Sequence, residues 1–383
     1  MTKIQQEMGF RFTGPDYCDL FKRSDATSFQ HPVWLERLYD TLVPAVGAEP
    51  LVITGRDEGS GKLQFVLPLV RRASRHVRRV EFADLGVSDY AAPVIVGAVE
   101  DVFTDPGTYE AVHKALGRTD LACIDKVPGE PALMSTVLGS QSVRTHDYET
   151  HAITLDGTFE SWRERLEPRF VRHLNDKRKR LRAAGRVVDV REVDSTGEVD
   201  AAFARMREFR RARFADRQAI DLVQDERYYA FYREVARHGA AHGGPGSTTV
   251  LTVNDDIVAA SFCLKDAERD AFLLIGYDIE RFRNYALGLL LVEDLIAASF
   301  ADGKRVHDLT LGHDDYKKSF GAEATPMYSV RLPMTARGRA AQFGADQNAR
   351  ARRLAKRALS FQERRFPQLD LENRIRRLLV SRP

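Results

Sequence analysis

Short apolar runs separated by polar turns fill the first 150 residues of the chain. Residues 50–54 and 63–70 are typical of two strands, and the Asp-, Gly- and Ser-rich loop 57–61 between them predicts a hairpin. Further runs predict two more strands and two helices, over residues 94–96, 121–124, 32–42 and 108–116. This part of the chain is therefore expected to be a mixed α/β unit, and it shows no evident cluster of catalytic residues.

Longer periodic stretches follow from residue 151. Tyr228, Phe231, Tyr232 and Val235 recur at the spacing of one helical face, which predicts a helix over residues 226–238. Two helices are expected before it, the strongly basic stretch 158–184 and residues 199–214. Gly185 is a stop signal for the first of them. The remaining expected elements are strands at 249–253, 257–264 and 271–276, a helix at 286–300, and strands at 306–310 and 327–332.

The order of these elements limits the possible folds. It is not a regular alternation of strand and helix, and the chain has neither the GxxxxGK[ST] phosphate loop nor a GxGxxG motif after a first strand. Two domains plus an appendage suit a chain of 383 residues. We expect an α/β (α+β) protein with domains at 1–150 and 151–335 and a helical tail at 336–383.

Charge sets the tail apart from the rest of the chain. Residues 337–383 hold 13 Lys and Arg against 4 Asp and Glu, whereas the preceding residues are mildly acidic. Residues 371–379 place leucines and an isoleucine on one helical face with arginines around it. The tail is thus expected to be a solvated helix or a contact surface for an anionic partner, including a membrane surface touched peripherally.

Cysteine content and hydropathy point to an intracellular setting. The three cysteines are far apart and form no CxxC pair, which argues against disulfides and against a metal site. The chain has no apolar stretch of membrane-spanning length and no secretory signal pattern. We expect a cytoplasmic protein without a bound metal.

The most informative stretch runs from Leu274 to Leu290. A hydrophobic strand enters a loop and then a helix rich in leucine, and the first amides of such a helix can hold a pyrophosphate. Arg281 and Arg283 could add positive charge to the same anion, and Gly288 permits close approach of a ligand.

These residues resemble a known family. Arg283-Asn284-Tyr285-Ala286-Leu287-Gly288 is similar to the acyl-CoA loop of GNAT acyltransferases, (Gln/Arg)-x-x-Gly-x-(Gly/Ala), with Ala286 in place of the first glycine. The segment from Leu311 to Ala322, which contains Tyr316-Lys317-x-x-Phe320-Gly321, and the segment Asp89-Tyr90-x-x-Pro93 resemble the CelD/FemAB-like acyltransferases. The resemblance covers about residues 30–333 and implies two tandem GNAT-like domains with mixed central sheets flanked by helices.

The resemblance also implies a reaction and its residues. An N-acyltransferase would hold an acyl-CoA, with an acetyl or longer chain, next to an amine of a small molecule or glycan precursor, and direct attack would follow in a ternary complex. The expected donor-binding residues are Gly276, Tyr277, Arg281, Arg283, Asn284, Ala286, Leu287 and Gly288. The expected catalytic residues are His313, Asp315 and Tyr316, and the expected acceptor-binding residues are Asp278, Asp314 and Lys317.

Two alternatives stay open at the level of sequence. The basic stretch 158–184 could grip RNA, as an aminoacyl-tRNA-dependent transferase of the Fem type would require, although the aromatic residues of an RNA-stacking platform are absent. A non-catalytic binding protein is the other alternative, and Ala286 is its main support. The sequence sets neither the oligomeric state nor the acyl group nor the acceptor.

Overall fold

The computed structural model describes residues 2–73, 76–103, 106–183, 187–215, 220–312 and 314–365. Its strands are β1 (Thr2–Glu7), β2 (Glu49–Asp57), β3 (Leu63–Ala73), β4 (Arg78–Phe82), β5 (Val94–Ile95), β6 (Leu121–Pro128), β7 (Val143–Thr154), β8 (Val188–Glu192), β9 (Gly246–Val253), β10 (Asp256–Lys265), β11 (Arg269–Tyr277), β12 (Val306–Leu311) and β13 (Glu323–Pro333).

The longer helices are α1 (Pro15–Arg23), α5 (Pro106–Leu116), α6 (Ala132–Leu138), α8 (Pro168–Ala183), α9 (Thr196–Phe214), α10 (Glu226–His242), α12 (Leu287–Ala301) and α14 (Ala336–Arg365). The shorter ones are α2 (Pro32–Arg37), α3 (Val43–Ala45), α4 (Val99–Val102), α7 (Phe159–Glu164), α11 (Ile279–Phe282) and α13 (Asp315–Ser319), with single turns η1 (Ser28–Gln30), η2 (Leu38–Leu42) and η3 (Leu222–Gln224).

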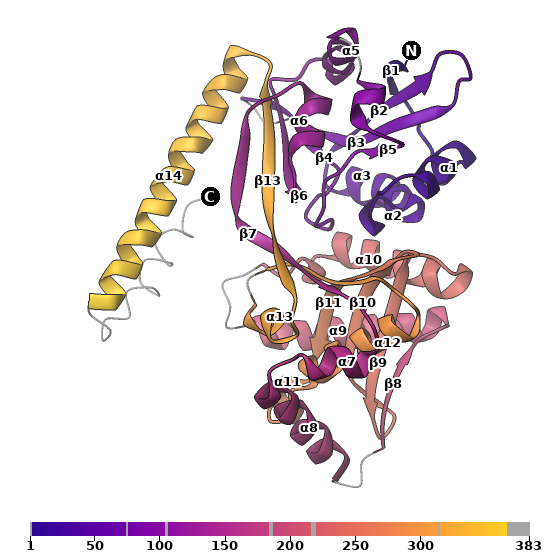
Figure 1. The fold of residues 1–383 in the computed structure, drawn as a ribbon, viewed down its shortest axis with the longest axis vertical. Coiled ribbons are helices and arrows are strands. Elements are labelled where there is room, and N and C mark those ends of the chain that lie inside the picture. The colour runs from indigo at the N-terminus through magenta and orange to yellow at the C-terminus, as the bar shows by residue number, and fades with distance from the viewer. Residues whose placement is uncertain are drawn as a thin grey trace.

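All strands of the described residues belong to one continuous sheet. Its order is β1-β2-β3-β4-β6-β13-β7-β12-β11-β10-β9-β8, with β5 added beside β3. Two neighbouring pairs are parallel, β4 with β6 and β11 with β12, and the others are antiparallel. The sheet therefore consists of two similarly ordered halves that meet at β13 and β7, which run side by side from the upper half of Figure 1 into the lower half.

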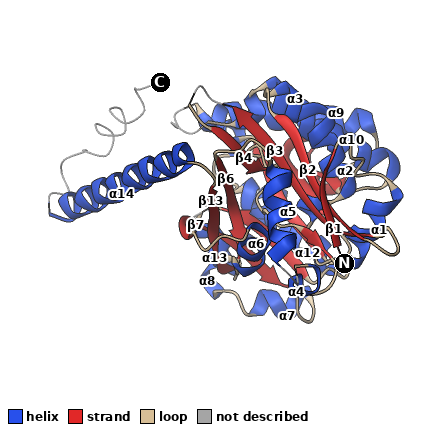
Figure 2. Cartoon of the chain, turned by 90° about the horizontal axis from the view of Figure 1, so that it is seen from above, coloured by secondary structure: helices blue, strands red, loops and turns tan. Residues whose placement is uncertain are grey.

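Helices cover both faces of this sheet (Figure 2). One apolar core lies within the first half and another within the second, between the sheet and α12. A third core belongs to both halves, because Trp34 of α2 packs edge to face on Phe231 of α10, with ring centroids 4.7 Å apart. The expected mixed α/β architecture with helices flanking the sheet is confirmed, and its two halves share an edge and a core.

Three sequence expectations need adjustment. The basic stretch 158–184 forms two helices, α7 and α8, because Pro168 lacks a backbone N–H and begins a new helix instead of continuing the old one. Residues 32–42 form α2 followed by a π-helical turn. The domain boundary expected at residue 150 falls inside β7, so the limits of the two units stay a prediction.

The tail begins as a docked helix. Gly338 lies against the carbonyl of Asp120, where an added Cβ would come within 1.7 Å of the oxygen, and Gln342 donates a hydrogen bond to Ser142. Further along, α14 projects away from the body (Figure 2). The amphipathic stretch 371–379 and the stop signal at Gly185 lie outside the described residues.

Candidate active site

A cavity opens where two parallel strands separate. β11 and β12 pair over only three residues, ending at Ala271 and Asp308, yet β11 continues to Tyr277. A bulge between Asp308 and Thr310 interrupts the ladder of β12 with β7, and Thr310 has a φ of 57°, which is rare for a β-branched residue. β12 thus turns away and leaves the last part of β11 without a strand partner on that side.

The cavity has a volume of about 360 Å³ and a mixed lining. β11 contributes Phe272, Ile275 and Tyr277, and the next segment contributes residues from α11 through the start of α12. Seven of the lining residues were expected from the sequence: Tyr277, Arg283, Ala286, Leu287, Gly288, Asp314 and Tyr316.

The first turn of α12 presents backbone amides to this cavity. Ala286 is the residue before the helix and adopts a left-handed conformation, with φ 53° and ψ 41°. The family pattern has glycine at this position, so the alanine keeps a glycine-like turn at a cost of about 1 kcal/mol. The first amides of a helix have no acceptor within it, and Leu287 and Gly288 line the cavity. An anion at this point would meet both the amides and the positive end of the helix dipole.

The packing of Tyr277 requires a glycine at position 288. A Cβ added to Gly288 would lie 2.8 Å from Cε1 of Tyr277, so the tyrosine ring covers the helix at this point. The guanidinium of Arg213, from α9, lies 5.5 Å from the centre of the same ring. The wall formed by Tyr277 is thus held from two sides.

Positive charge around the cavity comes from three residues, of which the sequence had indicated only Arg283 for this role; Arg213 of α9 is a second lining residue. Arg283 is exposed and lines the cavity. Lys177 of α8 donates a hydrogen bond to the backbone oxygen of Asn284, 2.7 Å away, which brings the basic helix to the loop before α12. Asn284 itself is exposed and is held through its carbonyl.

Three residues expected at the donor or acceptor site have other contacts. Arg281 forms ion pairs with Asp278 and with Asp256 and does not line the cavity. Asp278 is buried and caps α11 by accepting from the amide of Arg281, so it has no surface for an acceptor. Gly276 faces α9, where an added Cβ would lie 2.6 Å from the carbonyl oxygen of Met206, so packing and not ligand contact requires a glycine here.

The segment after β12 supplies two further lining residues. Asp314 and Tyr316 face the cavity, whereas Asp315 is exposed and lies outside its lining. Burial raises the pKa of the Tyr316 phenol above its ordinary range, so this group keeps its proton at neutral pH. Asp314, assigned to acceptor binding on sequence grounds, is thus better placed than Asp315 to accept a proton. His313 lies outside the described residues.

Lys317 is a structural residue, contrary to its expected contact with an acceptor. Its side chain is 2% exposed, and Nζ donates to the carbonyls of Thr310 and Leu311, at 3.1 and 2.7 Å. Burial lowers its pKa. Lys317 therefore satisfies the end of β12 at the point where that strand turns away from β11.

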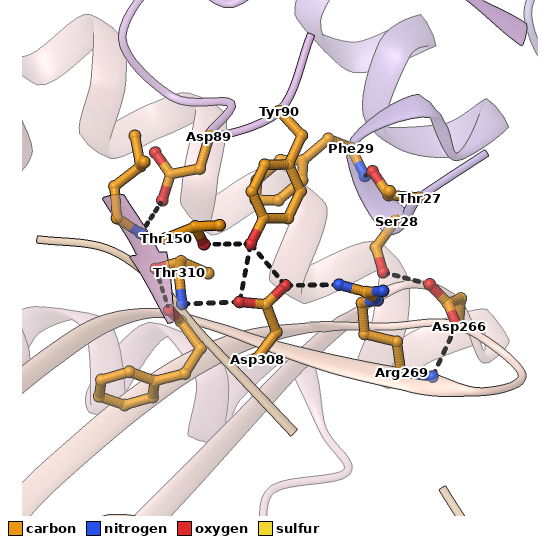
Figure 3. Close-up of polar contacts among 12 residues, drawn as sticks. Thr27, Ser28, Phe29, Asp89, Tyr90, Thr150, Asp266, Arg269, Asp308 and Thr310 are labelled. Carbon is orange, nitrogen blue, oxygen red and sulfur yellow. Dashed lines mark hydrogen bonds and ion pairs between the residues drawn. The ribbon is translucent and has the colours of Figure 1, made fainter. Parts of the chain in front are cut away.

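The Asp89-Tyr90 segment connects the first half of the sheet to this strand (Figure 3). The Tyr90 hydroxyl donates to the carboxylate of Asp308, whose oxygens are 2.7 and 2.8 Å away, and is hydrogen-bonded to Thr150. Arg269 forms an ion pair with the same carboxylate at 2.7 Å. Asp308 is fully buried, so these donors compensate its lost hydration and hold the separating strands in place.

Comparisons with known proteins identify a family match and a shared fold. Residues 168–318 match the acetyltransferase (GNAT) domain family. The fold is similar to that of FemX, with 11% identity and a TM-score of 0.56 over 84% of this chain and 96% of that one. It is also similar to the C-terminal domain (DUF2156) of an Agrobacterium fabrum protein described as a lysylphosphatidylglycerol synthetase, with 13% identity and a TM-score of 0.53 over 86% and 95% of the two chains.

A third similar structure is L-PGS from Bacillus licheniformis, with 10% identity and a TM-score of 0.51 over 86% of this chain and 95% of that one. Identities this low establish a shared fold alone. Among curated proteins, none matches the sequence. No helix in the described ranges is long and apolar enough to cross a membrane.

The family match includes β11, the start of α12 and α13, which together form the cavity. The mirrored strand order of the two halves gives the architecture of a tandem arrangement. Residues 168–318 therefore form an acetyltransferase (GNAT) domain, set in a sheet whose two halves have similar strand orders.

Proposed function

We propose that this protein is an N-acyltransferase that moves an acyl group from acyl-CoA to an amine by direct attack within a ternary complex. The observation that carries the proposal is the cavity between β11 and the start of α12. It brings together the last part of β11, which has no strand partner on one side, the first turn of α12 and apolar side chains around one volume of about 360 Å³.

Each part of the donor would meet a suitable group. The pyrophosphate would lie on the amides of Leu287 and Gly288, with Arg283 and Lys177 adding positive charge. The thioester would lie along β11, whose backbone beyond Ala271 faces the opening. A strand amide there would polarise the carbonyl oxygen as negative charge develops on it.

Proton transfer would require little more than two side chains. Asp314 would accept the proton released by the attacking amine, and Tyr316, kept protonated by burial, would donate to the departing thiolate of CoA. Holding both reactants in position would supply most of the rate acceleration. The acceptor is expected to be an amine of a small molecule or glycan precursor.

Isothermal titration with acetyl-CoA and a longer acyl-CoA tests the donor site, and two neighbouring arginines provide a matched comparison. Arg283→Gln should weaken acyl-CoA binding about tenfold, because a charge-assisted hydrogen bond to phosphate is lost. Arg281→Gln should leave the affinity unchanged, because Arg281 faces Asp256 and Asp278. Equal losses of acyl-CoA affinity in both variants, or no binding of acyl-CoA by the wild type, would contradict the proposed donor site.

A second candidate function is transfer from aminoacyl-tRNA, as in the Fem-type alternative. It is favoured by the exposed basic side chains of α8, which include Arg172, Lys179 and Arg180, and by the contact of that helix with the donor loop. A parallel titration with charged tRNA separates the two. Binding of tRNA with a steep salt dependence and no response to acyl-CoA would favour this candidate. If the protein binds neither acyl-CoA nor charged tRNA, a non-catalytic binding protein is favoured.

A further inference from the structure

A second charged cavity lies in the first half of the sheet, far from the donor site. It has a volume of about 490 Å³, and its lining consists of Glu49, Arg71, Arg72, Arg78, Arg79, Arg118 and Thr119. We call these five arginines and the space between them the arginine groove. It shares no residue with the donor cavity. It lies near the start of β6 and α14 in the upper part of Figure 1, whereas α11 and α13 are in the lower part.

The positive charge of the groove is only partly compensated. Arg78 forms a bidentate pair with Asp120, at 3.0 and 3.1 Å, and Arg72 lies 3.7 Å from Glu81. Arg79 and Arg118 form no ion pair with any described residue. Even with Glu49 counted, the arginines exceed the nearby carboxylates. An excess of guanidinium groups around a concave space favours a multiply charged anion.

The backbone holds like charges against one another in this groove. Arg72 and Arg79 are directly opposite each other in the antiparallel ladder of β3 and β4. Like charges at such positions destabilise a sheet, and the carboxylate of Glu81, 3.7 Å from Arg72, offsets part of this repulsion. A ligand with negative charge between the two side chains would remove this repulsion.

Two of the other arginines are already held in position. The guanidinium of Arg71 donates to the carbonyl of Leu116 and to Gln6, at 3.3 and 3.4 Å, and lies against Gly117. Arg78 is fixed by Asp120, which also accepts from Thr335 just before α14. The groove is thus partly preorganised, and the basic helix α14 begins beside it. Preorganised donors bind an anion at a smaller entropic cost.

We infer that the arginine groove binds a small molecule carrying two or more adjacent phosphate groups, at a site separate from the donor cavity. The planar fork of arginine suits the oxygens of phosphate, and five such forks from three segments surround one space. The concave shape favours a small ligand over a membrane surface or a nucleic acid backbone, which a broad convex surface would bind better. This inference does not depend on the proposed acyl transfer.

Titration of the full chain with inorganic pyrophosphate, compared with orthophosphate, tests the site directly. We expect pyrophosphate to bind more tightly than orthophosphate, and more weakly as salt is added. The double variant Arg79→Gln/Arg118→Gln should weaken pyrophosphate binding by at least about tenfold, because charge-assisted hydrogen bonds are lost. Arg305→Gln is the matched control, since Arg305 is an exposed arginine paired with Glu268 away from the groove. Absence of binding to the wild type, or equal binding by the double variant, overturns the inference.

The donor cavity is a competing place for pyrophosphate, and a crossed comparison separates the two. Gly288→Trp, which fills the donor cavity, should leave the groove's binding of pyrophosphate intact. The double arginine variant should keep its affinity for acyl-CoA. If Gly288→Trp abolishes pyrophosphate binding, the anion belongs to the donor cavity and the inference is wrong, whatever the outcome for acyl transfer.

Stability measurements distinguish a ligand site from a structural cluster. Arg79→Gln removes a like-charge contact with Arg72, so the melting temperature without ligand should hold or rise while the stabilisation by pyrophosphate is lost. A fall in the ligand-free melting temperature would instead show that Arg79 is structural. Vesicles containing phosphatidylglycerol and a short RNA complete the test. If either binds in a groove-dependent way and pyrophosphate does not compete, the small-ligand assignment is overturned.

Discussion

The two halves of the sheet have the same plan and differ at one place. In each half a run of antiparallel strands ends in a parallel pair, β4 with β6 and β11 with β12, and each pair is three residues long. In each half a non-glycine residue with positive φ follows in the last strand of the pair, Lys126 in β6 and Thr310 in β12. A bulge in the ladder on the other side of that strand is also common to both halves.

The two halves differ in the course of the chain beyond the parallel pair. β4 ends one residue after its last partner, and the chain then folds back over β6, where the amide of Ala91 donates to the carbonyl of Lys126. Lys126 Nζ in turn donates to the carbonyl of Ser88 at 2.7 Å. The opening of the first half is thus filled by its own loop. β11 runs on to Tyr277 with β10 as its one strand partner, and the opening on its other side is the cavity proposed to hold the donor.

The two halves show that one fold can either support a neighbouring half or leave a cavity open. The loop that fills the first opening also carries Tyr90, which reaches Asp308 in the second half. The loop of the first half thus lies over its own parallel pair and also supports the other half's separated strands. The most direct way to break the comparison is to fill the second opening as the first is filled.

Gly288→Trp should abolish acyl-CoA binding while the fold is retained. The glycine lies under the ring of Tyr277, which lines the cavity, so an indole at this position would displace that ring and disrupt the cavity wall. Isothermal titration measures the loss, and circular dichroism reports the fold. Gly197→Trp is the control, because a Cβ there meets nothing within 4 Å, and it should bind acyl-CoA normally. Retained affinity in a folded Gly288→Trp variant would remove the donor from this cavity.

Tyr90→Phe should lower the free energy of unfolding by about 2–3 kcal/mol, because a buried carboxylate loses a hydrogen bond. Urea unfolding gives the value. Tyr109→Phe serves as the control, since the Tyr109 hydroxyl makes only a 3.5 Å contact with the Phe103 carbonyl. A loss no larger than that of the control would mean that the connection between the halves does not depend on Tyr90.

His307 should make the second half sensitive to acid. Burial lowers its pKa to about 3, below the ordinary value of about 6.5. A depressed histidine pKa means that the unfolded chain binds the proton first, so stability is complete above about pH 6.5 and falls as pH decreases towards 3. Between pH 7 and pH 5, the free energy of unfolding of His307→Gln should fall by about 2 kcal/mol less than that of the wild type. If the free energies of unfolding of the two proteins change with pH in the same way, His307 is not the source of the acid sensitivity.

The smallest effect is expected at the strained turn before α12. Ala286→Gly should raise the free energy of unfolding by about 1 kcal/mol, since glycine adopts a positive φ without a Cβ clash. Ala297→Gly, inside the same helix, should lower the free energy of unfolding by a similar amount. Urea unfolding of both variants checks the pair. A loss of stability in Ala286→Gly would show that the turn stores no strain.

Local features of the fold and the site are predictable from the sequence. The apolar face of residues 226–238 predicts most of α10, and the pattern at 283–288 locates a segment that lines the cavity, because both depend on neighbouring residues. β7 has no such signal, since its polar residues are paired on both sides by strands distant in sequence. The contacts of Lys317 depend in the same way on where β12 turns. The arginine groove is equally hidden, because its members come from three separate segments.

The position of β13 has a consequence for synthesis of the chain. β6 receives its second neighbour only from β13, which comes after the whole second half of the sheet in the sequence. As the polypeptide leaves the ribosome, the first half must wait with one edge of β6 uncovered, and such an edge is a template for pairing with other chains. Protection of nascent chains by a chaperone should therefore matter most before residue 333 has emerged.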